Sequence, residues 1–255
     1  MAGALFQRAA RRLGVRGAAP GCRRRSSAHR AREMMQAGEI ESALDDLVIA
    51  NRILANENVV DAYGHVSLRH PRDPRRFFLA RSLSPDRVER GDLMEFDLEG
   101  NPAAGDSRQP YLERFIHAAA YEARADVQAV VHAHAEDVLP FGITAAPLRP
   151  VIHSGSFMGE HVPVWDIRDR FGDTNLLVTN MPQGRDLART LGGNNVALMR
   201  GHGFVAAARS LIEVVRMSVY VPRNAGYKPY SPETWRAWEY WATRAGCAHL
   251  LSKKG

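Results

Sequence analysis

Residues 111–135 read YLERFIHAAAYEARADVQAVVHAHA, and this stretch decides the class of fold that we expect. Apolar residues recur at helical spacing over 111–123, which predicts an amphipathic helix. Residues 127–135 form an apolar run that ends in two histidines, which is typical of a buried strand. The short connection at Ala125 and Asp126 folds the helix back on the strand. A helix and a strand joined in this way indicate an α/β protein.

The remaining sequence supplies further elements of both kinds. We expect helices at 41–55, at 183–191 and from about 210 to Pro222, where the proline would end the last one. We expect strands at 59–70, 76–80, 176–179, 196–200 and 204–208, a hairpin-like stretch at 92–102, irregular structure at 141–164 and aromatic packing at 227–241. No repeat and no change of composition divides residues 35–255, so we expect them to form one domain.

The net charge of +6 comes from the N-terminal segment. Residues 1–32 hold nine arginines and no acid, and beyond them acidic residues outnumber basic ones. We therefore expect residues 1–34 to be a disordered basic tail, either a transit peptide or the product of a mis-assigned start codon. Phe6 is its only Phe, Tyr or Trp, so stacking on bases is not expected, and neither is a nucleic-acid partner.

Composition excludes several other classes of protein. No run approaches the roughly 18 to 20 apolar residues that span a bilayer, so no membrane partner is expected. Two cysteines are too few for a disulfide framework. We expect a cytoplasmic protein, or a mitochondrial one if the source is eukaryotic and residues 1–34 are a transit peptide. All three lysines lie in the last 28 residues, which argues against a Schiff-base enzyme.

Three histidines indicate a metal site. His132 and His134 are two residues apart in the predicted strand, so both side chains project to one side, about 7 Å apart at the backbone. His202 lies between two glycines, which permit close approach of the backbone. The alternative is that these are hydrogen-bonded core histidines. Three neutral imidazoles would leave a divalent ion its full charge and open positions, and we expect zinc or manganese, with iron as a third choice.

Other residues are candidates for contact with substrate. Glu113 opens the predicted helix, where it could cap the helix, act as acid or base, or fill a vacant position on the metal. Arg200 adjoins the Gly-His-Gly turn and is the arginine that we expect to bind a substrate carboxylate. Three other arginines, Arg69, Arg81 and Arg149, are weaker candidates.

The sequence from about 42 to 221 resembles the class II aldolase/adducin family. The resemblance rests on four motifs in family order, which are Gly64-His65-Val66-Ser67, Glu113, Val130-Val131-His132-Ala133-His134 and His202-Gly203. It implies a three-layer α/β/α sandwich around a mixed sheet, assembled as a homotetramer with active sites at subunit interfaces. It also implies a divalent metal bound by His132, His134 and His202, with Glu113 catalytic. His65, Ser67 and Ser82 fall in loops that bind substrate in the family.

The departures from the family's sugar-phosphate aldolases change the expected substrate. Proline at 85 and Tyr111-Leu112 replace groups that would hold a phosphate. The motifs are similar to a decarboxylase branch that includes 3-hydroxy-2-methylpyridine-4,5-dicarboxylate decarboxylase. We therefore expect a metal-dependent carbon–carbon lyase that decarboxylates a hydroxylated aromatic or pyridine carboxylate through a metal-stabilised enolate. The alternatives are a retro-aldolase acting on an unphosphorylated hydroxy-keto acid, a non-haem iron oxygenase and a non-catalytic adducin-like module.

Overall fold

The computed structural model describes residues 27–226 and 234–250. The chain divides into two units, Met1–Gln36 and Ala37–Gly255, and the description below concerns the second. Helix α1 spans Ser27–Asn56, so the helix expected at 41–55 begins earlier, inside the basic segment. Within the described residues, no helix is both long and apolar enough to cross a bilayer.

The core of the protein is a seven-stranded sheet with the order β3-β2-β1-β4-β7-β6-β5. Its strands are β1 His65–Arg69, β2 Arg76–Ala80, β3 Leu93–Asp97, β4 Ala129–Ala133, β5 Val164–Trp165, β6 Val196–Met199 and β7 Gly203–Ala208. Only the edge pair β5 and β6 is parallel, and all other neighbours are antiparallel, so the sheet is mixed. Every residue of β4 and β7 is buried, which places these two strands at the centre.

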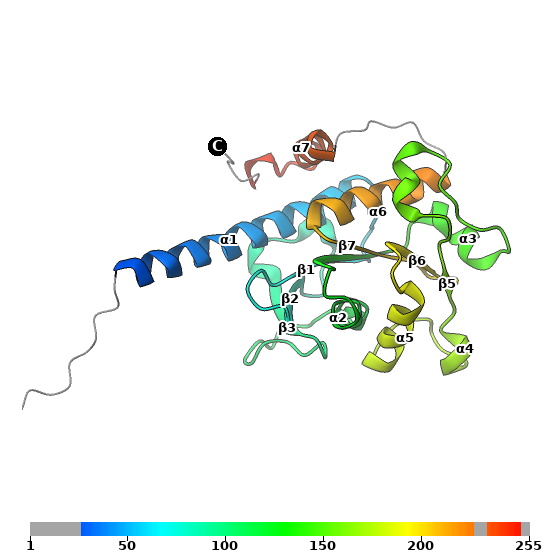
Figure 1. Ribbon diagram of the computed structural model, residues 1–255, viewed down its shortest axis with the longest axis horizontal. Coiled ribbons are helices and arrows are strands. Elements are labelled where there is room, and N and C mark those ends of the chain that lie inside the picture. The colour runs from blue at the N-terminus through cyan, green and yellow to red at the C-terminus, as the bar shows by residue number, and fades with distance from the viewer. Residues whose placement is uncertain (1–26, 227–233, 251–255) are drawn as a thin grey trace, which may run out of the picture. The chain divides into compact units, whose positions relative to one another are not determined.

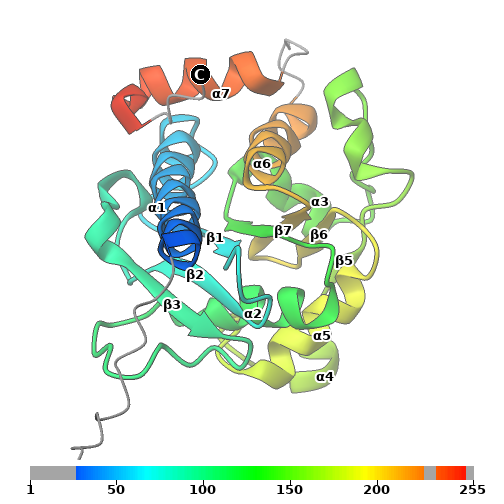
Figure 2. The same cartoon turned by 60° about the vertical axis from the view of Figure 1, so that its left-hand side comes forward.

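Helices cover both faces of this sheet. The part of α1 from Ala37 onward lies with α6 on one face, and α2 lies with α5 on the other (Figures 1 and 2). The helices are α2 Arg114–Ala123, α3 Leu139–Ile143, α4 Arg168–Phe171, α5 Met181–Leu191, α6 Leu211–Ala225 and α7 Thr234–Arg244. The expected three-layer α/β/α sandwich around a mixed sheet is confirmed.

Local sequence explains where α5 begins and how closely it packs. The side chain of Asn180 accepts a hydrogen bond from the amide of Gln183, which satisfies a backbone donor that the first turn leaves free. Gly184 then faces α2, where an added Cβ would lie 2.4 Å from the carbonyl oxygen of Phe115. Only a glycine allows the two helices to approach so closely.

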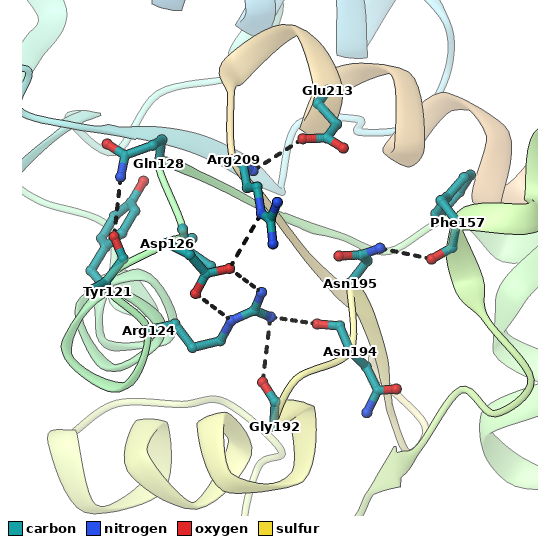
Figure 3. A network of polar contacts seen from close by, with 12 residues as sticks. Tyr121, Arg124, Asp126, Gln128, Phe157, Gly192, Asn194, Asn195, Arg209 and Glu213 are labelled. Carbon is teal, nitrogen blue, oxygen red and sulfur yellow. Dashed lines mark hydrogen bonds and ion pairs between the residues drawn. The ribbon is translucent and has the colours of Figure 1, made fainter.

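The connection between α2 and β4 is held by charged side chains. Arg124 donates to the carboxylate of Asp126 and to the carbonyl oxygens of Gly192 and Asn194 (Figure 3). Asp126 also lies 3.9 Å from Arg209 at the end of β7. These contacts tie the end of α2 to the segment that follows α5, so they fix how α2 lies against the strand that it precedes.

Two expected elements were wrong, and the local backbone explains both. Residues 176–179 form no strand, and Leu176 has a φ of 67°, which interrupts an extended backbone. The edge position belongs instead to β5, which begins at the last residue of the stretch expected to be irregular. Pro222 lies inside α6, which runs on to Ala225, since a proline near a helix end removes one hydrogen bond while the later residues keep theirs.

Other boundaries differ by a few residues. Of the strand expected at 59–70, only β1 is a strand, and the buried Val59 and Val60 precede it in a loop. In the aromatic segment, residues 227–233 lie outside the described residues. Trp238 and Trp241 of α7 are buried, as expected for packing.

Candidate metal centre

Four side chains from three parts of the fold meet at one end of β4. His132 lies in β4, His134 follows it, and the turn between β6 and β7 carries His202. The ligand atoms of these histidines and of Glu113 all lie within 4.8 Å of one another. The Nε2 atoms of His132 and His134 are 2.9 Å apart. The alternation of strand side chains thus brings the two imidazoles together.

The backbone at Gly203 explains how His202 reaches this point. Ala133 pairs with Phe204 across β4 and β7, so the turn lies beside the end of β4. A Cβ on Gly203 would lie 2.2 Å from the carbonyl oxygen of Ala133. The glycine is therefore required by the close approach of the two chains.

The hydrogen bonds of the histidines test whether a metal fits. Nδ1 of His132 lies 3.1 Å from the carbonyl oxygen of Phe204. Because a carbonyl only accepts, Nδ1 carries a hydrogen, and Nε2 is the nitrogen left to face a metal. Neither ring nitrogen of His202, although buried, makes a hydrogen bond within the described part of the chain. A buried polar group without a partner costs about 1–3 kcal/mol, so a bound ion would satisfy what the protein leaves unpaired.

Glu113 is held by a backbone donor and faces the histidines. Its Oε1 accepts a hydrogen bond of 3.0 Å from the amide of Val178. Its Oε2 lies 3.5 Å from Nε2 of both His132 and His202. The residue stands at the N-cap position of α2, but its side chain makes no capping hydrogen bond. It therefore does not cap the helix through a hydrogen bond of its side chain.

Burial and neighbouring charge set the ionisation of these groups. Burial raises the pKa of Glu113, but His132 and His202 overcome that effect and hold it well below its usual range. Burial, with His132 and His202 nearby, lowers the pKa of His134 to about 4. At neutral pH the cluster therefore offers a carboxylate and an uncharged His134 imidazole, which is the form that binds metals.

His65 lies beside the cluster but is not part of it. It faces His132 across β1 and β4, and the two ring centres are 5.3 Å apart. Its Nδ1 lies 2.6 Å from Nε2 of His117. Burial lowers the pKa of His65 well below its ordinary value, and the neighbouring histidines add to the effect.

Three other residues expected to bind substrate have other partners. Ser67 is fully buried, and its hydroxyl contacts His117 and Tyr121. Arg200 pairs with Asp166 at 3.3 Å and donates to carbonyl oxygens of the α3 segment. Ser82 is exposed, and its amide donates to the carbonyl oxygen of Gln109.

The three weaker arginine candidates also have contacts within the protein. Arg69 is buried and donates to four backbone carbonyl oxygens, among them those of Val127 and Tyr121. Arg81 forms an ion pair with Asp92 at 2.7 Å. Arg149 contributes its carbonyl oxygen to Asn224.

Sequence reasoning missed His117 and Tyr121. Both are almost fully buried and lie on α2 at positions four and eight after Glu113. Residues four apart lie on the same face of a helix, so the motif Glu-x-x-x-His-x-x-x-Tyr carried a signal that could have found them.

A cleft of about 760 Å³ reaches the cluster at His134. Its lining includes five carboxylates, from Glu57, Asp61, Asp86, Glu136 and Asp137. It includes only two guanidinium groups, Arg223 and Arg244, and both pair with Glu57. The lining is therefore net negative, and a strongly anionic ligand is favoured only near a bound cation.

A profile described as the Class II Aldolase and Adducin N-terminal domain matches residues 45–227, which is most of the chain. The chain belongs to the class II aldolase and adducin family. The family and fold expected from the motifs are thereby confirmed. Glu113, His132, His134 and His202, which the resemblance assigned to the site, all lie inside the matched range.

Relatives of this class II aldolase family member are similar over most of its length. The decarboxylase tropJ of Talaromyces stipitatus is 38% identical over 186 residues, covering 68% of this chain and 70% of the relative. A 3,4-dihydroxyphthalate decarboxylase of Arthrobacter keyseri is 30% identical over 199 residues, covering 72% of this chain and 76% of the relative. An aldolase II superfamily protein from Pseudomonas syringae has a similar fold, with a TM-score of 0.65 and 19% identity. The match covers 85% of this chain and 95% of that protein.

These similarities place the chain in the decarboxylase-like branch of the class II aldolase family, as expected. The protein is an enzyme, and its class is that of the lyases. Its Glu and His cluster has the composition and geometry to hold a divalent metal ion.

Proposed function

We propose that this protein is a divalent-metal-dependent decarboxylase acting on a hydroxylated aromatic or pyridine carboxylate. The observation that carries the proposal is the cluster of Glu113 with His132, His134 and His202, whose ligand atoms lie within 4.8 Å of one another beside a cleft. The decarboxylase relatives support the same reaction class. Zinc or manganese suits this ligand set, and iron is the third choice.

The three histidines would hold the ion. When bound, it supplies positive charge that stabilises the negative charge developing on a substrate oxygen as the carbon–carbon bond breaks. Because Glu113 keeps its carboxylate ionised and is held by the amide of Val178, it is the group placed to move a proton.

The proton balance of the reaction shows which proton Glu113 would move. It takes the proton of the substrate hydroxyl and delivers it to the ring carbon that bears the carboxylate. The bond to the carboxylate then breaks, CO₂ leaves, and the electron pair of that bond moves into the ring ketone. The oxygen that gains this charge is protonated to give the product phenol. One proton from solvent is consumed for each CO₂ released.

Among the residues expected to orient the substrate carboxylate, His65 fits best. It lies beside His132, whereas Arg200 is engaged by Asp166 and by backbone carbonyl oxygens. The net negative lining of the cleft favours a substrate whose charge is concentrated near the cluster. We therefore propose that a monocarboxylate is a better substrate than a dicarboxylate whose second charge extends into the cleft.

The assembly that we propose is a homotetramer, following the family resemblance. Leu112, next to Glu113, and Tyr63, whose ring centre is 6.5 Å from that of His134, are 56% and 69% exposed. Large apolar side chains exposed beside a site are suited to contact with another subunit. Sedimentation analysis of the purified protein measures the number of subunits.

The test of function combines metal analysis with a screen for released CO₂. The purified protein is loaded with zinc or manganese and incubated with hydroxylated benzoates and pyridine carboxylates. CO₂ release that depends on the metal supports the proposal. Pyruvate or an aldehyde formed from hydroxy-keto acids, without CO₂, would select a retro-aldolase instead. Bound iron with uptake of O₂ would select an oxygenase.

A further inference from the structure

A chain of hydrogen bonds leads from the interior of the protein to the edge of the metal site. The phenol oxygen of Tyr121 lies 2.7 Å from Oγ of Ser67, and that oxygen lies 2.6 Å from Nδ1 of His117. Nε2 of His117 lies 2.6 Å from Nδ1 of His65. All four side chains are between 0% and 4% exposed, so water does not compete for these contacts.

Each link of this chain holds one hydrogen, so only two arrangements are consistent. Burial lowers the pKa of His117 to about 3, so this ring is neutral and one of its nitrogens donates while the other accepts. If Ser67 donates to His117, then His117 donates to His65. If Ser67 donates to Tyr121 instead, every later bond reverses, and His65 donates to His117.

The hydroxyl of Tyr121 selects between them. Tyr121 is almost fully buried, and the acceptor within hydrogen-bond distance of its hydroxyl, among the described residues, is Oγ of Ser67. A buried hydroxyl hydrogen needs an acceptor, so Tyr121 donates to Ser67. The reversed arrangement would leave that buried hydrogen without a partner.

The selected arrangement has a consequence at the metal site. Nδ1 of His65 accepts from His117, so the hydrogen of the His65 ring is on Nε2. Within residues 27–226 and 234–250, His65 Nε2 makes no hydrogen bond, and the centre of the ring lies 4.6 Å from that of Tyr111 and 5.3 Å from that of His132. This leaves one N–H donor beside the cluster without a partner among the described residues.

We propose that His117, held by Ser67 and Tyr121, is a positioning residue that fixes His65 with its hydrogen on Nε2, as a donor to the substrate carboxylate. The inference rests on the proposed decarboxylase function. It gives His65 a different role from Glu113, because a ring whose other nitrogen is already occupied by His117 cannot serve as the base. A fixed donor would keep the bond to the leaving CO₂ aligned with the ring system that receives its electrons.

A matched pair of substitutions at position 117 tests the proposal. The side-chain amide of His117→Gln can still donate to His65, whereas His117→Leu cannot. We expect His117→Leu to lower kcat by about 10-fold to 100-fold with a smaller change in KM, and His117→Gln to recover most of the loss. Zinc content and circular dichroism of both variants confirm that each is loaded and folded.

The tautomer is read directly by ¹⁵N NMR of zinc-loaded protein labelled at histidine, with His65→Asn to assign the signals. We expect wild-type His65 to show an unprotonated Nδ1 and a protonated Nε2, and His117→Leu to show both tautomers. A hydrogen on Nδ1 in wild type, or wild-type kcat in a zinc-loaded His117→Leu, would overturn the proposal. If His117→Leu does not fold, Ser67→Ala replaces it, because it removes the hydroxyl that directs His117.

The two proposals fail separately. If no carboxylate releases CO₂, the proposed function is wrong, but the NMR signals of His65 still decide whether the hydrogen-bond chain exists. If CO₂ is released and the hydrogen is on Nδ1, the function stands and the role of His117 is refuted.

Discussion

Two groups of buried histidines lie side by side in this protein, and they differ in what satisfies them. In the chain formed by Tyr121, Ser67, His117 and His65, three consecutive hydrogen bonds of 2.6–2.7 Å join the four side chains. In the metal cluster, neither ring nitrogen of His202 has a hydrogen-bond partner among the described residues, and Nε2 faces the Glu113 carboxylate at 3.5 Å. The difference teaches that burial of a histidine indicates nothing about its role, whereas an unpaired buried nitrogen indicates a missing ligand.

The largest effect on kcat is expected at Glu113, the carboxylate of the cluster, whose role we distinguish from that of the three histidines. Glu113→Gln should lower kcat by about 10²-fold to 10⁴-fold, since it removes the group proposed to move the proton. Zinc content should stay near wild type, because three histidines remain. Metal analysis and CO₂ release measure the two quantities. If excess zinc restored activity, Glu113 would be a ligand rather than the proton carrier.

The second prediction concerns the unpaired nitrogens of the cluster. His202→Leu should weaken zinc binding by more than about 100-fold, a larger effect than loss of a supporting hydrogen bond has. The metal-free variant should unfold within about 1 kcal/mol of metal-free wild type, because among the described residues the substitution removes only the 3.5 Å contact between Nε2 and the Glu113 carboxylate. Zinc titration and urea unfolding with chelator measure these values. A marked loss of stability without metal would show that His202 has a structural partner.

A histidine-to-leucine substitution in the hydrogen-bonded chain should have the opposite effect, changing stability and leaving zinc binding unchanged. His117→Leu should leave zinc affinity near wild type but lower the free energy of unfolding of the metal-free protein by about 1–3 kcal/mol, because Ser67 and His65 lose a buried partner. Urea unfolding with chelator provides the measurement. Equal stability of His117→Leu and His202→Leu would remove the distinction between the two groups.

The smallest effect is expected at the entrance to the cluster. Asp86→Asn removes one negative charge from the cleft lining, so the KM for an aromatic dicarboxylate should fall by about 2-fold to 5-fold. The KM of a monocarboxylate serves as the control and should change less. Measurement at two salt concentrations should show a smaller difference at the higher one. Equal changes in both KM values would contradict a role for charge in selecting the substrate.

Prediction from sequence succeeded where the signal was local. The strand at 76–80 and the helix ending at Gly192 were recognised from apolar pattern and capping residues, because these act over a few positions. Prediction failed at 176–179, where the backbone turns at Leu176, and at Pro222, where the proline lies close enough to the helix end to be tolerated. The loop at 176–179 is used to present the amide of Val178 to Glu113.

The same division applies to the candidate site. Sequence spacing placed His132 and His134 on one side of a strand, because alternation is a local property, and the Gly-His-Gly turn and the family resemblance marked His202 and Glu113 as their companions. Only the tertiary structure decided that Ser67 supports His117 and that Arg200 pairs with Asp166. Those partners lie 50 and 34 residues away along the chain. Hydrogen bonds over such separations depend on how the strands and helices pack, which no local pattern records.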